Sequence, residues 1–341
     1  MIRKENIHSR MILTDRGLRN ENEIVQGDKI IEYGTNNFLE VKDIELKNLK
    51  RLYKVYYSDM RTQYVSDSEM ILNGNDLHTP EEYHPDVYER KPIEQYPIEF
   101  TDEIHDSLNP DPYSAGAIFG YADYTSPYVN LRSHCFDAIN HICTTYHYTS
   151  AYKGGLTVFQ TYKEYDYVTW NEMFGKYVFF ARRNRIDEPA IPLNYTYASI
   201  HDRKQFIRGI FDAGYLQDDS PDSAAINHWS SDRLEWIQWI LLSLGIQFRI
   251  TTHTKNKYDY KFRLDVIDKC KYWPGLFHDY GYMANMVDTD NRIAKTDVGD
   301  PLCIDYIEEM HNDFINELVP HFIFDKENVI GLDAQLLPKY L

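Results

Sequence analysis

"PYSAGAIFGYADY", residues 112–124, places Gly116 and Gly120 four residues apart inside an apolar run at helical spacing. Glycine in a helix interior costs about 0.5–1 kcal/mol relative to alanine, so a compensating contact is needed. Residues four apart lie on one face of a helix. We therefore expect a second helix to pack unusually close against this face.

A second stretch, "FIRGIFDAGY" at residues 206–215, repeats the spacing with Gly209 and Ala213. The first stretch is followed by strand-like "YVNL", helical "SHCFDAINHICTTY" and strand-like "GLTVFQTY". The second is followed by "SAAINHW", the helix "SSDRLEWIQWILLSLG" and a hairpin. The order helix, strand, helix, strand occurs twice, which indicates an internal duplication with its two first helices paired at small residues.

The charge of the chain is uneven. The net charge is −17, which argues against a nucleic-acid binder, because Lys and Arg supply most of the non-specific affinity for phosphate. Residues 108–285 carry 18 Lys and Arg against 19 Asp and Glu, so 16 of the net negative charges lie outside this segment. This difference in net charge indicates that residues 108–285 and the flanking segments belong to separate domains.

Some classes of protein are not expected from this sequence. It has no apolar run of 18 residues and no secretory signal pattern, so we expect neither a membrane protein nor a secreted one. Cys135, Cys143, Cys270 and Cys303 form no C-x2-C pair. We therefore expect no zinc site and no other metal, and free thiols in a reducing compartment.

Over residues 108–285 the sequence resembles the LAGLIDADG homing endonucleases. "YSAGAIFGYA" is similar to their first motif and "FIRGIFDAGY" to their second. The resemblance implies an α+β fold with a pseudo-twofold core of order αββαββα. Its two motif helices would cross at Gly116, Gly120, Gly209 and Ala213.

The flanks resemble the Hint module of inteins, split around an inserted endonuclease domain. "RMILTDRGLRNENEIVQGDKIIEYG" is similar to the start of that module, and "CIDYIEEMHNDFINELVPHF" to its closing blocks. The implied domains are a Hint-like β module at 1–85, an acidic linker or arm at 86–107, the duplicated core at 108–285, and a C-terminal Hint-like part with a tail at 286–341.

The residues that would cut DNA have changed. In the family each motif helix ends with an Asp or Glu followed by Gly, and the two acids hold divalent metals that activate water. Here these positions are Tyr121 and Gly214, and the acids nearest to them are Asp123 and Asp212. We expect no catalysis and no cofactor; Mg²⁺ is implied only for a chain that still cuts.

The residues that would splice have changed as well. An intein begins with a Cys or Ser nucleophile, and the alignment puts Glu5 there. Ser66 and Glu69 replace the Thr and His of a Thr-x-x-His block, and His321-Phe322 replaces the terminal His-Asn. Glutamate does not donate a proton as an imidazolium does, and phenylalanine has no amide nitrogen to cyclise.

We interpret the chain as a catalytically inactive protein derived from an intein with its endonuclease, used as a structural or protein-binding component. The 29 tyrosines favour protein partners, because tyrosine is enriched at interfaces. By analogy with phage-borne mobile elements, we expect a phage particle or phage-encoded complex as its setting. The location would then be the host cytoplasm or the virion.

Two other functions and a decaying gene product remain as alternatives. One is a free-standing homing endonuclease that still cuts, and the other is a DNA-binding regulator that has lost cleavage. Either would need a basic surface on the core. The candidate DNA contacts are Arg182, Arg183, Arg185, Arg249, Lys261 and Arg263. We expect this set to give only weak DNA binding.

Overall fold

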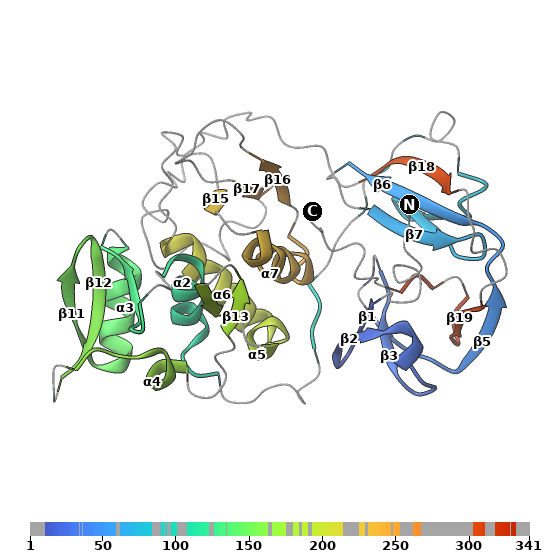
Figure 1. Ribbon diagram of the computed structural model, residues 1–341. Helices are drawn as coiled ribbons and strands as arrows, with labels where there is room; N and C mark the ends of the chain where they lie inside the picture. The colour runs from blue at the N-terminus through green and yellow to red at the C-terminus, as the bar shows by residue number, and fades with distance from the viewer. Residues whose placement is uncertain are drawn as a thin grey trace, which may run out of the picture. The chain divides into compact units, whose positions relative to one another are not determined.

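The computed structural model describes part of the 341-residue chain. The described residues are 11–33, 35, 37–58, 62–83, 89, 91, 93, 97–100, 108–122, 126–133, 135–162, 166–174, 180–183, 186–189, 193–213, 225–228, 231–246, 248–252, 262–266, 303–310, 318–327 and 329–331. The chain divides into two compact units (Figure 1). Unit 1 comprises Met1–Glu103, Gly245–Gln247 and Asp300–Leu341, and unit 2 comprises Ile104–Leu244 and Phe248–Gly299.

Unit 1 is built mainly from short antiparallel strands. One sheet has the order β2-β1-β3-β4, with β1 at Met11–Thr14, β2 at Gly17–Asn20, β3 at Lys29–Ile31 and β4 at Phe38–Glu40. A 3-10 turn, η1 (Glu21–Glu23), follows β2 and is closed by a capping box between Asn20 and Glu23. Gly17 has a φ of 93° in the tight β1–β2 turn, a conformation that favours glycine. Strands β8 (Ile71–Asn73) and β9 (Asp76–His78) form a separate hairpin.

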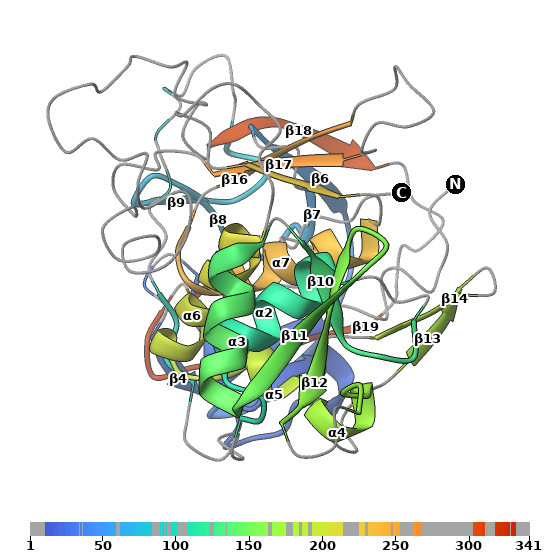
Figure 2. The same cartoon turned by 90° about the vertical axis from the view of Figure 1, so that its left-hand side faces the viewer.

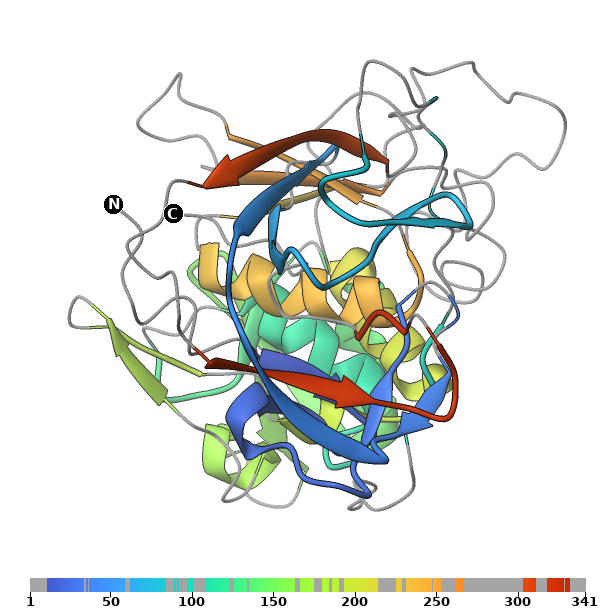
Figure 3. The ribbon, with the colours of Figure 1, turned by 90° about the vertical axis from the view of Figure 1, so that its right-hand side faces the viewer.

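Strands from the far end of the sequence complete the sheets of unit 1. β6 (Leu52–Tyr57) pairs with β7 (Thr62–Ser66) on one side and with β18 (Ile304–Met310) on the other. β5 (Asp43–Asn48) pairs with β19 (Leu318–Ile323), with Phe322 opposite Ile44. Figure 3 shows β5 and β6 as one nearly continuous blue ribbon, with a red strand at each end. The fold of this unit thus depends on both ends of the chain.

Two apolar clusters among the described residues belong to the core of unit 1. Ile12, Ile24, Ile30 and Val41 are buried together, and Phe322 of β19 packs against them. Leu49 and Leu52 form the second cluster, against which Val319 packs. Alternate residues of a strand point to opposite faces. β19 therefore contributes to one cluster through Phe322 and to the other through Val319.

Unit 2 contains two sets of elements in the same order, apart from α4, which only the first set has among the described residues. The first set is α2 (Pro112–Tyr121), β10 (Asn130–Arg132), α3 (Phe136–Tyr146), β11 (Tyr148–Lys153), β12 (Leu156–Thr161) and α4 (Trp170–Phe174). The second set is α6 (Ile200–Ala213), β15 (Ala225–His228), α7 (Ser231–Ser243), β16 (Phe248–Thr252) and β17 (Phe262–Val266). Both antiparallel sheets have the same strand order, β10-β12-β11 and β15-β17-β16. Figure 2 shows the first sheet with α3 beside it.

Local capping explains where the helices of unit 2 begin and end. Asp111 caps α2 by accepting from the Ser114 amide, and Pro112 takes the first helical position. The Ser199 hydroxyl accepts from the Asp202 amide at the start of α6. Gly245, with a φ of 69°, follows the end of α7. The buried Arg203 guanidinium donates to the Ser243 carbonyl at 2.8 Å, so α6 also closes the last turn of α7.

The structure confirms the predicted α+β class. Between α2 and α3 the described residues form one strand, β10, where the implied order αββαββα has two, and other elements were not predicted. β11 was not expected, and α6 starts at Ile200, ahead of the predicted motif. A hairpin of β13 (Phe180–Arg183) and β14 (Ile186–Pro189), followed by α5 (Leu193–Thr196), separates the two sets. No helix among the described residues is long and apolar enough to cross a membrane. The proposed domain boundaries and the Hint assignment remain predictions.

Candidate functional site

The two glycine-bearing helices, α2 and α6, lie side by side in unit 2 (Figures 1 and 2). A Cβ atom at Gly116 would lie 1.9 Å from the Phe206 carbonyl oxygen, and one at Gly209 would lie 2.0 Å from the Tyr113 carbonyl oxygen. Each of these carbonyls lies three residues before the glycine of its own helix, so the contact is reciprocal. The glycines let the two backbones meet where no side chain fits.

The other two small residues lie at the same helix pair. A Cβ atom at Gly120 would lie 3.2 Å from Cγ2 of Ile210, which is a side-chain contact rather than a backbone one. Ala213 is the last residue of α6 and is buried. The backbones of α2 and α6 therefore approach each other most closely at Gly116 and Gly209.

The motif-ending positions lie mostly beyond what the structure describes. Tyr121 is the last residue of α2, and its side chain is not described. Gly214 and Asp123 fall outside the described residues. Of this set, Asp212 is the residue whose side chain the structure describes.

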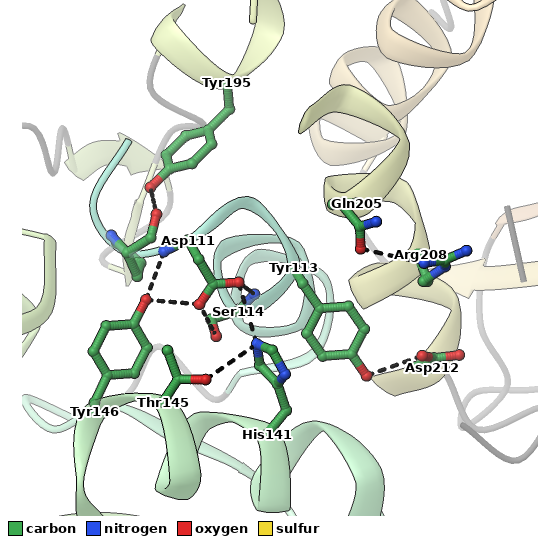
Figure 4. Close-up of polar contacts among 11 residues, drawn as sticks. Asp111, Tyr113, Ser114, His141, Thr145, Tyr146, Tyr195, Gln205, Arg208 and Asp212 are labelled. Carbon is green, nitrogen blue, oxygen red and sulfur yellow. Dashed lines mark hydrogen bonds and ion pairs between the residues drawn. The ribbon is translucent and has the colours of Figure 1, made fainter. Parts of the chain in front are cut away.

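Asp212 is buried and bonded across the helix pair. The Tyr113 hydroxyl on α2 donates to Asp212 Oδ2 at 2.9 Å (Figure 4), while Oδ1 is buried without a hydrogen-bond partner. Burial raises the pKa of Asp212 to about 7; the Tyr113 bond and the charge of Arg208 oppose this, and Asp137 adds to it. Near neutral pH this carboxyl is therefore partly protonated.

A second polar cluster surrounds the start of α2 (Figure 4). Asp111 accepts from the Ser114 hydroxyl at 2.6 Å and from the Tyr146 hydroxyl at 2.7 Å, and His141 Nε2 lies 3.3 Å from Asp111 Oδ1. Although burial raises the pKa of Asp111, these bonds from His141, Ser114 and Tyr146 hold it well below its usual range. The Tyr195 hydroxyl donates to the neighbouring Pro110 carbonyl at 2.5 Å.

No motif in the sequence singles out this second cluster. Its members come from the start of α2, from α3 and from α5, which are far apart in the sequence. The pattern Asp-Pro before the helix indicates a cap, but nothing in the sequence shows that Tyr146 and His141 converge on the same carboxylate. The arrangement stabilises the helix start and holds α3 against it.

No described group of three or more His, Cys, Asp or Glu side chains is arranged to hold a metal ion. The Cys135 thiol donates to the Ala213 carbonyl at 3.1 Å, at the end of α6. Burial raises the pKa of this thiol to about 12, so it stays protonated and unreactive near neutral pH. Cys135 therefore contributes to packing at the end of α6.

In unit 1, three of the predicted splicing positions lie around one small hollow. Ser66, Glu69 and His321 line a recess of about 30 Å³ between β7 and β19. Glu69 Oε2 accepts from the Ser66 amide at 2.7 Å, and the Ser66 hydroxyl lies 3.0 Å from that of Ser68. The Glu69 carboxylate thus bonds to the backbone at the start of the turn in which Glu69 lies. The structure brings these three positions together, while Glu5 lies outside the described residues.

A larger cavity of about 340 Å³ adjoins this recess, and the two share Ser68, Glu69, Pro320 and His321. Phe322 lines the larger one. Burial and the charge of Lys47 lower the pKa of His321, and the charges of Glu69 and Glu45 oppose this. His321 is thus mainly neutral near pH 7.

The candidate DNA contacts are spread over separate sheets of unit 2. Arg182 and Arg183 lie in β13. Arg249 of β16 is paired with Asp265 of β17, and Arg263 of β17 is paired with Thr251 of β16. Arg185 and Lys261 lie outside the described residues.

The chain shows weak structural similarity to a homing endonuclease. Mesophilic variants of the homing endonuclease I-DmoI match with a TM-score of 0.29 and 11% identity, over 50% of this chain and 95% of that chain. I-DmoI in complex with DNA and Ca matches with the same TM-score and 12% identity, over 50% of this chain and 89% of that chain. No protein-family model and no curated protein matches the sequence.

Proposed function

We propose that this protein acts by binding other proteins and does not cleave DNA, on a scaffold related to LAGLIDADG endonucleases and inteins. The observation that carries the catalytic half of the proposal is the state of Asp212, one of the two acids nearest to the changed motif ends. Its carboxyl is buried, bonded to Tyr113 and shifted to a pKa of about 7. A carboxyl that is partly neutral and already engaged is a poor ligand for a hard divalent cation.

The residues at the motif ends support the same proposal. Tyr121 and Gly214 supply no carboxylate where the resemblance places the two metal-binding acids. Two-metal hydrolysis needs a carboxylate anchor for each ion. The paired glycines at Gly116 and Gly209 serve the scaffold and not the reaction, so a chain without those acids still keeps its helix pair.

Exposed aromatic side chains support a role in protein binding. In unit 2, Phe136 is 74% exposed, Tyr152 is 73% exposed and Tyr162 is 61% exposed. Such residues are enriched at protein interfaces, where their burial contributes much of the affinity. A phage particle or phage-encoded complex would be a fitting setting, as would the host cytoplasm.

A cleavage assay tests the catalytic half of the proposal. The full chain is incubated with genomic DNA of its source and with Mg²⁺ or Mn²⁺, beside an active LAGLIDADG enzyme on its own target. We expect no site-specific nicks or breaks. Site-specific cleavage that disappears in Asp123→Asn or Asp212→Asn would reject the proposal and favour a working endonuclease.

The binding half is tested by affinity purification from the native host, read by mass spectrometry. We expect a stoichiometric protein partner that also binds the purified chain in vitro. Recovery of DNA alone, or no partner that survives the in vitro step, would contradict this half.

A further inference from the structure

Strand β19 has one edge, its free edge, with which no strand among the described residues pairs. It pairs with β5 along Leu318–Ile323, and within the described residues this two-stranded ladder is its only sheet. On this free edge alternate residues of β19 present backbone N–H and C=O groups with no strand partner among the residues that the structure describes, and Pro320 has no N–H to offer. An open strand edge is a template for pairing with another extended chain.

Strand β19 borders the cavity of about 340 Å³ in unit 1. Residues 320–323 of β19 and Phe324 after it line this cavity. Because consecutive residues of a strand point to opposite faces, a run of this kind indicates that the strand meets the cavity along its edge. Apolar side chains of Ile12, Ile30 and Phe322 line the same space. An edge beside an apolar hollow has the two parts that strand addition uses, backbone hydrogen bonds for affinity and a pocket for a side chain.

The charged residues around the cavity favour a basic partner. Glu69 and Glu327 line it, and the ammonium group of Lys326, which also lines it, is bonded to Glu32 at 2.6 Å. His321 adds little positive charge near pH 7, because burial lowers its pKa. Of the net charge of −17, all but one unit lies outside residues 108–285. A basic partner complements this surface.

We propose that the free edge of β19 and the adjoining cavity bind an extended segment of a partner protein, which adds to β19 as a strand and carries apolar and basic side chains. This inference rests on the proposed function, to which it adds a binding surface and the chemistry of the partner. The apolar side chains fill the cavity, and the basic ones reach Glu69 and Glu327.

The probe for this proposal is a fluorescein-labelled seven-residue peptide in which lysine and valine alternate. It is titrated with the full chain and followed by fluorescence anisotropy. Two control peptides are matched to it, one with glutamate in place of every lysine and one with N-methyl groups on alternate backbone nitrogens. We expect saturable binding of the probe, no detectable binding of the acidic peptide, and about tenfold or greater loss on N-methylation.

Protein variants and hydrogen exchange locate the binding. Glu69→Gln keeps an acceptor for the Ser66 amide and removes the charge, and we expect about threefold weaker binding. Glu309→Gln, a variant on β18 away from the cavity, should bind as the parent does. Hydrogen exchange read by mass spectrometry should show peptide-induced protection at residues 318–324.

Several results would overturn the inference. They are absence of binding, equal binding of the acidic or the N-methylated peptide, and protection elsewhere than at β19. If the peptide does not bind and DNA remains uncut, this inference fails while the proposed function stands. If DNA is cut at a specific site, the proposed function fails whatever the peptide does.

Discussion

At the scale of single residues, Asp212 and Asp111 show how burial and hydrogen bonding act in opposite directions on a carboxyl. Asp111 receives hydrogen bonds from Ser114 and Tyr146 and lies close to His141, and its pKa is held low. Asp212 receives one hydrogen bond, from Tyr113, and burial raises its pKa. The number of donors decides which carboxyl stays charged.

Asp212→Asn should stabilise the chain increasingly as pH rises. The pKa of Asp212 rises from 3.8 to about 7 on folding, so the folded state binds the proton more tightly and parent stability falls between about pH 4 and pH 7. Asparagine still accepts from Tyr113 but has no charge to bury. We expect the variant's advantage in the free energy of unfolding to grow with pH, to a limit on the order of 4 kcal/mol.

Urea unfolding at pH 5, 6, 7 and 8 measures this difference. Asp325→Asn, which changes an exposed carboxylate, is the matched control and should show little dependence on pH beyond the parent's. If the difference in the free energy of unfolding between Asp212→Asn and the parent did not change with pH, ionisation of the buried Asp212 carboxyl would not be what destabilises the parent.

At the scale of elements, the α2–α6 pair depends on a contact between two backbones. The space at Gly116 and Gly209 is taken by carbonyl oxygens, which cannot turn away without breaking the helix. At Gly120 the neighbour is the side chain of Ile210, which can shift. Glycine is therefore required at Gly116 and Gly209, whereas a small side chain can be accommodated at Gly120.

Gly116→Ala should destabilise the chain by about 2–3 kcal/mol despite alanine's better helix propensity, because its methyl group would collide with the Phe206 carbonyl. Gly120→Ala is the matched control and should stay within about 1 kcal/mol of the parent. Gly120→Leu should destabilise by overpacking against Ile210. Denaturant unfolding of the three variants provides the comparison, and equal stability of the two alanine variants would refute the backbone contact.

At the scale of the whole molecule, charge limits what the chain binds. The core is nearly neutral and the flanks carry almost all of the net negative charge. A polyanion within a Debye length of about 8 Å at physiological salt is repelled by such flanks. In the register of β16 and β17, Arg249 also has an acidic residue, Asp265, as its cross-strand partner.

The full chain should therefore bind duplex DNA no more tightly than roughly 10⁻⁴–10⁻⁶ M at 150 mM salt. Fluorescence anisotropy with a labelled duplex measures this, and the double variant R249Q/R263Q should bind as the parent does. Nanomolar, sequence-dependent binding with a steep salt dependence, weakened in the double variant, would support the DNA-binding regulator in place of the protein-binding role.

The sequence by itself determined the repeated order of elements and the pairing of α2 with α6. Both follow from local patterns, since the four-residue spacing of small residues and the period of apolar residues are carried within each segment. β11 was not predicted, because its residues are largely polar or exposed, as Tyr152 is, and show no alternation of apolar and polar residues.

Only the tertiary structure decided the rest of the candidate sites. The cluster on Asp111, the burial of Asp212 and the free edge of β19 beside its cavity each combine residues from distant parts of the chain. A sequence pattern specifies which face of an element is apolar, but it does not specify which distant side chain meets it. Whether a carboxyl keeps its charge, or a strand edge stays open, depends on those distant contacts.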